Sequence, residues 1–125
     1  GLAAEECARY EEVELGGEPV VVRGDPRLLR RLVRNLLENA RRHGKPPVRV
    51  TVTVAASFAE LRVCDAGPGV PEAERETVFE PFYRRPGAAD GVGAGLGLAL
   101  VRQVARRHGG GALCEGNCFK ATLSR

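Results

Sequence analysis

The sequence of 125 residues lacks the features that mark membrane, secreted and highly charged proteins. It contains no run of about 18 apolar residues and no basic stretch followed by an apolar one at its amino terminus, so we expect neither a membrane span nor a signal peptide. It also lacks a large excess of either charge. The 19 Lys and Arg residues oppose 16 Asp and Glu residues, and a net charge of +3 does not by itself imply a nucleic-acid or membrane partner.

The four cysteines have none of the spacings typical of zinc or redox sites, because Cys7, Cys64, Cys114 and Cys118 include no C-x-x-C pair. We expect four small buried thiols. A disulfide between Cys114 and Cys118 across a hairpin is geometrically conceivable, but a chain without a secretory signal is expected in a reducing compartment.

The residues that are present are typical of a folded domain. Hydrophobic residues make up 43% and charged residues 28%, which argues against disorder and against a fibrous chain. The length allows a single core between two layers of secondary structure. We therefore expect residues 1–125 to form one domain.

Periodicity predicts two long helices and several strands. The Asp25-Pro26 pair predicts a helix start, and the helix should end near residue 43, where Gly44 is expected in a left-handed conformation. A second helix is expected at 96–108, after a glycine-rich loop at 67–97 with a brief helical pattern at 72–78. Strands are expected at 11–15, 19–23, 48–54, 59–64, 112–115 and 118–124.

The first long helix carries polar residues beside its expected buried face. At about 100° per residue, its apolar side chains fill one half of the circumference, and Asn35, Asn39 and Arg42 line one edge of that half. A buried amide must be hydrogen-bonded. The asparagines therefore either bond to a neighbouring loop or present two oxygens, one turn apart, to a hard cation such as Mg²⁺, with Arg42 placed to meet phosphate.

Asp65 follows directly from a predicted strand and precedes Gly67 and Gly69. A carboxylate at a strand end can accept a hydrogen bond from an exocyclic amine. Adenine offers that donor at N6, whereas guanine presents a carbonyl at the corresponding position, so that two acceptors would face each other. The same spacing of Asp and Gly also occurs in plain turns, and both interpretations remain open at this point.

The segment 91–98 places four glycines at the start of the second long helix. Glycines allow the backbone to approach a ligand, and the first amides of a helix attract phosphate. The segment fits the dinucleotide fingerprint G-x-G-x-x-G poorly, and no G-x-x-x-x-G-K-[ST] occurs in the chain. It predicts either a phosphate loop of another kind or a flexible hinge.

Taken together, these segments resemble the ATP-binding catalytic domain of bacterial sensor histidine kinases, part of a wider class that includes gyrase, the Hsp90 chaperones and MutL. In order along the chain, they resemble the N box (34–43), the first glycine box (65–69), the F box (78–84) and the second glycine box (93–98) of that family. The resemblance implies the Bergerat-type fold, an α/β two-layer sandwich with a mixed, mainly antiparallel sheet of about five strands packed on three helices, beneath a mobile ATP lid.

The resemblance also implies a role for individual residues. Asn39 would bind Mg²⁺ with Asn35 close by, and Asp65 would bind the adenine amine. The adenine pocket would be shaped by Gly67, Gly69 and Val70, and the end of the lid by Gly93, Gly95, Leu96, Gly97 and Leu98. Arg42 occupies the place of a phosphate-binding lysine, and His43 that of an aromatic residue near the nucleotide. Phe79 and Phe82 would either anchor the lid or be generic core aromatics. Arg84 would contact the γ-phosphate or the partner domain, or else be a solvated loop charge.

The phosphate acceptor implied by the resemblance is a histidine on a separate dimerisation domain. His43 and His108 are the only histidines in the sequence, and neither lies in the motif that surrounds such an acceptor. We therefore expect the catalytic fragment of a longer kinase, either cytoplasmic or the cytoplasmic domain of an inner-membrane sensor. A response-regulator aspartate would receive the phosphate next, and we expect this fragment to contact neither nucleic acid nor membrane.

Other functions remain open beside this one. A superfamily ATPase would need a water-activating glutamate at the position of Asn35, and an asparagine cannot act as that base, so hydrolysis should stay below roughly 1 s⁻¹. A non-catalytic nucleotide-sensing module would have a degenerate site, against which the intact Asn39, Asp65 and glycines argue. An anti-sigma-factor kinase is disfavoured because the F box resembles that of sensor kinases more closely. The segment 114–119 departs from the family's usual closing hairpin.

Overall fold

The computed structural model describes residues 2–7, 13–17, 24–83 and 96–125. Its elements follow the chain in this order: α1 (Leu2–Cys7), β1 (Val13–Gly17), α2 (Pro26–His43), β2 (Val48–Val54), β3 (Phe58–Cys64), the short 3-10 helices η1 (Glu72–Glu74) and η2 (Thr77–Phe79), α3 (Gly97–Arg107), β4 (Gly111–Glu115) and β5 (Cys118–Ser124).

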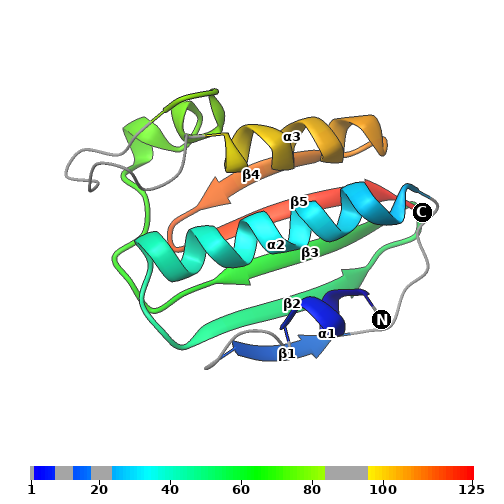
Figure 1. Ribbon diagram of the computed structural model, residues 1–125, viewed down its shortest axis with the longest axis horizontal. Helices are drawn as coiled ribbons and strands as arrows, with labels where there is room; N and C mark the ends of the chain where they lie inside the picture. The colour runs from blue at the N-terminus through cyan, green and yellow to red at the C-terminus, as the bar shows by residue number, and fades with distance from the viewer. Residues whose placement is uncertain (1, 8–12, 18–23, 84–95) are drawn as a thin grey trace.

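The strands form one five-stranded sheet in the order β1-β2-β3-β5-β4. β1 runs parallel to β2, and each other pair of neighbouring strands is antiparallel. The α-helices lie on one face of this sheet, where α2 and α3 lie side by side and run in opposite directions (Figure 1). The expected two-layer sandwich with a mixed, mainly antiparallel sheet is therefore confirmed.

Alternation along the strands gives the sheet an apolar face and a polar face. Val50 and Val63 pair across β2 and β3 and are almost fully buried beneath the helices. On the other face, Lys120 forms ion pairs with Glu60 at 3.1 Å and Glu115 at 3.5 Å. The core between the layers includes Leu32, Leu36, Leu37, Phe79, Val101, Val104 and Phe119.

Helix α2 begins and ends where the sequence predicts, but the residue that follows it has a different conformation from the one expected. Asp25 is extended, its carboxylate accepts the amide hydrogen of Arg27 at 2.9 Å, and proline occupies the first helical position. The left-handed conformation expected for Gly44 is wrong, because its φ of −102° and ψ of −166° are those of extended backbone. A Cβ at Gly44 would lie 2.2 Å from Cγ of Asp65, so glycine is required here for close approach.

The expectation of four thiols is also wrong. Cys64 and Cys118, which lie opposite each other on β3 and β5, form a disulfide. The alternative pairing of Cys114 with Cys118 is excluded by the same bond, and Cys114 is buried in β4. The two bonded cysteines are 54 residues apart in sequence, so only the pairing of β3 with β5 brings them together.

The remaining elements lie close to their predicted positions. The first strand is Val13–Gly17 and not 11–15, and the strand predicted at 19–23 lies outside the described residues. The helical pattern at 72–78 forms η1 and η2, and the other strands and α3 begin and end within one or two residues of their predicted bounds.

Candidate functional site

Asp65 lies immediately after β3, with its carboxylate held from one side. Its Oδ1 accepts the amide hydrogens of Gly67 at 2.6 Å and Lys45 at 3.3 Å. Among the described residues, every donor to this carboxylate binds Oδ1, so Oδ2 is the oxygen that remains for a ligand. The bond from Gly67, two residues on, is that of an Asx turn, and together with the bond from Lys45 it orients the carboxylate.

The glycine box after Asp65 packs against the turn between β4 and β5. Gly69 has a φ of +82°, and a Cβ on it would lie 2.5 Å from the carbonyl oxygen of Gly116. Val70 is buried, and its amide donates to the same carbonyl at 3.0 Å. Both the positive φ and the close approach require glycine at position 69.

The side chains of Asn35 and Asn39 are half-buried on α2, one turn apart. Neither side-chain amide hydrogen-bonds to another residue in the part of the chain that the structure describes, so no described loop satisfies them. A Cβ on Gly97, the first residue of α3, would lie 3.8 Å from Cγ of Asn35. Asn35, Leu96 and Gly97 help to line a cavity of about 540 Å³ to which α2 and α3 both contribute.

The cationic end of α2 is exposed. Arg42 Nε lies 3.5 Å from Oε2 of Glu38, and the exposed positions of Arg42 and His43 leave both side chains in contact with solvent. A surface pair of this kind contributes little to stability and is easily exchanged for another anion.

The structure separates the two phenylalanines of the F box. Phe79 is buried, packs edge-to-face on Phe119 at a centroid distance of 6.0 Å and lies beneath the Arg102 guanidinium. Phe82 is 71% exposed with a φ of +65°. The core interpretation is therefore right for Phe79 and wrong for Phe82.

Arg102 connects the F-box segment to α3 and β4. It forms an ion pair with Glu76 and donates to the carbonyl of Ala112 at 2.9 Å. The guanidinium, through its hydrogen bond and charge, holds the pKa of the Glu76 carboxyl below its usual value.

Several residues expected in the site lie elsewhere or outside the described part. Arg84, Gly93 and Gly95 are outside the described residues. Leu96 is 45% exposed, and Leu98 is half-buried and packs against the core.

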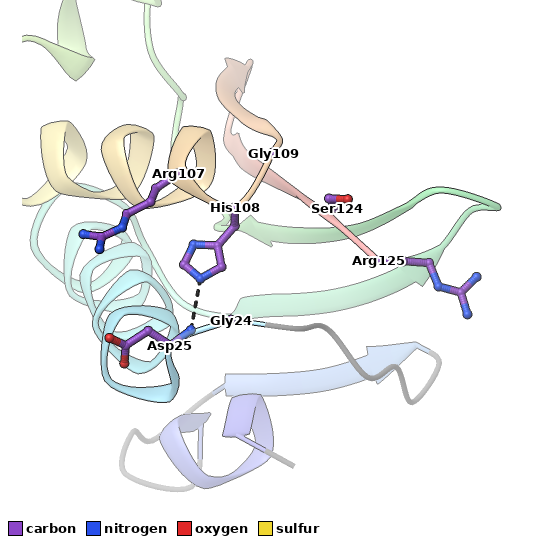
Figure 2. Close-up of a pocket in the computed structure, with 7 residues that line it drawn as sticks. All are labelled: Gly24, Asp25, Arg107, His108, Gly109, Ser124 and Arg125. Atoms are coloured by element: carbon purple, nitrogen blue, oxygen red, sulfur yellow. Dashed lines mark hydrogen bonds between the residues drawn. The ribbon is translucent and has the colours of Figure 1, made fainter.

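A second cavity, of about 520 Å³, lies at the opposite end of α2, where Asp25, Arg107 and His108 are among the lining residues (Figure 2). His108 Nε2 accepts the amide hydrogen of Asp25 at 3.2 Å, and its Nδ1 lies 2.8 Å from the carbonyl oxygen of Val104. A neutral ring that donates from Nδ1 satisfies both contacts. His108 therefore joins the end of α3 to the start of α2.

Two groups that hold Asp65, one from the backbone and one from a side chain, were missed in the sequence analysis. The amide of Lys45 and the side chain of Asn117 both bind this residue, Asn117 Nδ2 donating to its carbonyl at 2.6 Å. The Gly-Asn pair signals a hairpin turn in the sequence, but nothing in its spacing indicates a contact 52 residues away.

The donor set fits a nucleotide with a hard cation. No cluster of three or more His, Cys, Asp or Glu side chains suited to a metal occurs in the described ranges. The amide oxygens of Asn35 and Asn39 are uncharged oxygen donors, which suit a Mg²⁺ ion whose other ligands are water and phosphate oxygens.

None of the helices in the described part has the length and apolar character needed to cross a membrane.

Comparison with known proteins shows what the chain is similar to. The family model described as "Histidine kinase-, DNA gyrase B-, and HSP90-like ATPase" matches residues 24–125. The signal transduction histidine-protein kinase/phosphatase MprB of Mycobacterium sp. (strain KMS) is 50% identical over 97 residues, which cover 75% of this chain and 19% of MprB. MprB of Mycobacterium tuberculosis (strain H37Rv) is 48% identical over 92 residues. The chain thus spans about a fifth of the length of these relatives.

Solved structures resemble the chain over nearly its whole length. The mycobacterial sensor histidine kinase MprB superposes with a TM-score of 0.79 at 33% identity, covering 98% of this chain and 91% of that structure. The ATP-binding domain of PrrB from Mycobacterium tuberculosis gives 0.73 at 32% identity, covering 98% and 88%. The catalytic domain of the histidine kinase ThkA gives 0.80 at 24% identity, which is similarity of fold alone.

Proposed function

The chain belongs to the histidine kinase-, DNA gyrase B- and HSP90-like ATPase family, and on this premise we propose that it binds Mg-ATP and donates the γ-phosphoryl group to a histidine on a separate dimerisation domain. It would be the single catalytic domain of a longer sensor kinase, with a response regulator as the next acceptor. The names of the relatives, which are histidine-protein kinases, support this proposal over a superfamily ATPase or a nucleotide sensor.

The observation that carries the proposal is that, among the described residues, only one oxygen of the Asp65 carboxylate has hydrogen-bond donors. Two backbone amides hold Oδ1, and Oδ2 remains to accept a hydrogen bond from the N6 amine of adenine. Guanine would direct its carbonyl oxygen at the same carboxylate, so ATP should be preferred over GTP. Gly67, Gly69 and Val70 would shape the pocket around the base.

The phosphate end of the site would lie along α2 and the start of α3. Asn39, with Asn35, would hold Mg²⁺, which supplies charge neutralisation to the triphosphate when bound. Arg42 would exchange its contact with Glu38 for a phosphate, and the amides near Gly97 would face the same charge. We assign Gly93, Gly95 and Arg84 to the phosphate-facing lid, with His43 and Leu98 beside the nucleotide.

The phosphate acceptor would come from outside this chain. His108 is engaged by Asp25 and Val104 at the opposite end of α2, which supports a structural role for it. Phe82 and Leu96 are large exposed apolar side chains, and side chains of this kind suit contact with a helical partner domain. The location proposed for the chain is the cytoplasm, including the cytoplasmic side of a membrane sensor.

Calorimetric titration with ATP in Mg²⁺ tests the binding site. Asp65→Asn should weaken ATP binding about 10- to 100-fold, because a charge-assisted hydrogen bond is lost. Asn39→Ala should weaken binding in Mg²⁺ and leave binding in EDTA nearly unchanged. The matched control is Asp25→Asn, which keeps a good helix cap at the other end of α2. Equal affinity of ATP for Asp65→Asn and the unmodified protein would refute the assignment.

Transfer from γ-labelled ATP tests the reaction. Incubation with the dimerisation domain of the parent kinase should label that domain at its histidine, and the chain alone should remain unlabelled. Hydrolysis by the chain alone should stay below roughly 1 s⁻¹, because Asn35 cannot act as the base that activates water. Faster hydrolysis without labelling of the partner domain would favour a superfamily ATPase.

A further inference from the structure

The turn between β4 and β5 forms several hydrogen bonds with the segment that carries Asp65. The amide of Asp65 donates to the carbonyl of Asn117 at 3.1 Å, and the side-chain Nδ2 of Asn117 donates back to the carbonyl of Asp65 at 2.6 Å. Val70 donates its amide to Gly116, the other residue of the turn. One residue earlier, the disulfide between Cys64 and Cys118 joins the same two strands.

These contacts determine where the Asp65 backbone lies. Both of its main-chain polar groups bind Asn117, which leaves its side chain to bind the amides on the other flank, at Gly67 and Lys45. The direction in which Oδ2 points therefore depends on two sets of bonds. One comes from the glycine box and the end of α2, and the other from a residue at the tip of a hairpin.

Asn117 contributes little else to the fold. It is exposed, lies outside the hydrophobic core, and follows a glycine with a φ of +58° that already makes the turn. Turn formation by itself does not require an amide that donates to a distant carbonyl. The side chain is thus in contact with the main-chain carbonyl of the residue that carries the proposed base-binding carboxylate.

We propose that Asn117 is a positioning residue for base recognition, which holds the main chain of Asp65 so that Oδ2 meets the N6 amine of adenine. This inference rests on the proposed function, because it assigns to Asn117 a role in the specificity of that same site. Asn117 touches no reacting atom and acts only through Asp65.

The test compares ATP with inosine triphosphate, which has a carbonyl in place of the N6 amine. Asn117→Ala removes the Nδ2 donor and keeps the main-chain carbonyl that binds the Asp65 amide. ATP binding should weaken about three- to tenfold while inosine triphosphate binding changes less, so that the ratio of the two affinities falls. Asn117→Asp has the same shape without the donor and should reduce the ratio at least as much.

Glu115→Gln is the matched control, because Glu115 lies on the same hairpin and pairs with Arg62 and Lys120 and not with the glycine box. It should leave the ratio of affinities unchanged. Unfolding temperatures of all variants, measured by calorimetry, show whether the hairpin itself has been weakened.

Two results would overturn the proposal. The first is a wild-type ratio in both Asn117 variants, and the second is an equal loss of affinity for both nucleotides with a lower unfolding temperature, which is the result expected of a structural role. If the unmodified protein binds neither nucleotide, the proposed function itself fails, and the inference fails with it.

Discussion

Helix α2 has an aspartate at each end, and the two aspartates differ in burial and in how many amides their carboxylates bind. Asp25 caps the first turn, and its backbone amide donates to His108, so this end is closed by contacts within the protein. Asp65, just beyond the last turn, is half-buried, and its Oδ1 accepts amide hydrogens from two segments, at Lys45 and at Gly67. In the described part of the chain neither aspartate has a donor on Oδ2, so the two differ in burial and in the number of amides that orient the carboxylate. The comparison teaches that an oxygen without a donor marks a candidate binding residue only where the carboxylate is also partly buried and oriented by other segments.

The largest expected effect comes from a matched pair of glycines at these ends. A Cβ on Gly44 would lie 2.2 Å from Cγ of Asp65, and a Cβ on Gly24 would lie 2.3 Å from Cδ2 of His108. Gly44→Ala should reduce ATP affinity at least about tenfold, because the carboxylate must move. Gly24→Ala should displace only the His108 ring and change ATP affinity less than about twofold.

Titration calorimetry measures both affinities, and scanning calorimetry separates them from changes in stability. Equal losses of ATP affinity in the two variants would contradict the distinction between the two ends of α2.

Asp25→Ala should change stability without changing ATP affinity. The variant loses the acceptor for the Arg27 amide, which lowers the free energy of unfolding by about 1 kcal/mol and the unfolding temperature by about 4 °C. Asp25→Asn retains a cap and should differ little from the unmodified protein. A loss of ATP affinity in the folded Asp25→Ala variant would show that the two ends are coupled.

His108→Ala should have a smaller effect at the same end. The Asp25 amide loses its acceptor on the ring, but it lies at an exposed residue, so water replaces most of the lost bond. We expect the free energy of unfolding to fall by about 0.5 kcal/mol, measured in urea, with no change in ATP binding. A fall larger than that of Asp25→Ala would mean that the ring contributes packing beyond its hydrogen bond.

Glu76→Gln should have the smallest effect, because the ion pair with Arg102 involves a highly exposed carboxylate. The pKa of Glu76 is lowered in the folded protein, so its contribution to stability is present above the usual carboxyl pKa of 4.5 and is lost as the pH falls below it. Unfolding temperature should therefore decline less steeply in acid for the variant than for the unmodified protein. Glu72→Gln, at another exposed glutamate, is the control, and identical acid profiles for all three proteins would contradict the prediction.

Much of the architecture could be predicted because its signals are local. The period of α2, its Asp-Pro start and the alternation of Val48–Val54 are set by neighbouring residues and by the burial of one face, and these elements lie where expected. The same patterns could not separate Phe79 from Phe82. Both are aromatic residues in one motif, and only packing against Phe119 shows which is buried.

The candidate site was predictable as a set of residues and not as an arrangement. Asn35, Asn39 and Asp65 are conspicuous because polar groups stand where apolar residues or a simple turn are expected. Whether a loop satisfies the amides, and which oxygen of the carboxylate is available, depends on hydrogen bonds that no spacing encodes.

The sequence by itself determined the layered fold, the helix that carries the asparagines and the strand that ends at Asp65, because hydrophobic periodicity and helix caps act over a few residues. Only the tertiary structure decided the extended backbone conformation of Gly44 after α2, the disulfide between Cys64 and Cys118, and the hydrogen bonds between Asn117 and Asp65. Each of these depends on the close approach of segments that are distant in sequence, and their mutual distance is set by sheet register and helix packing.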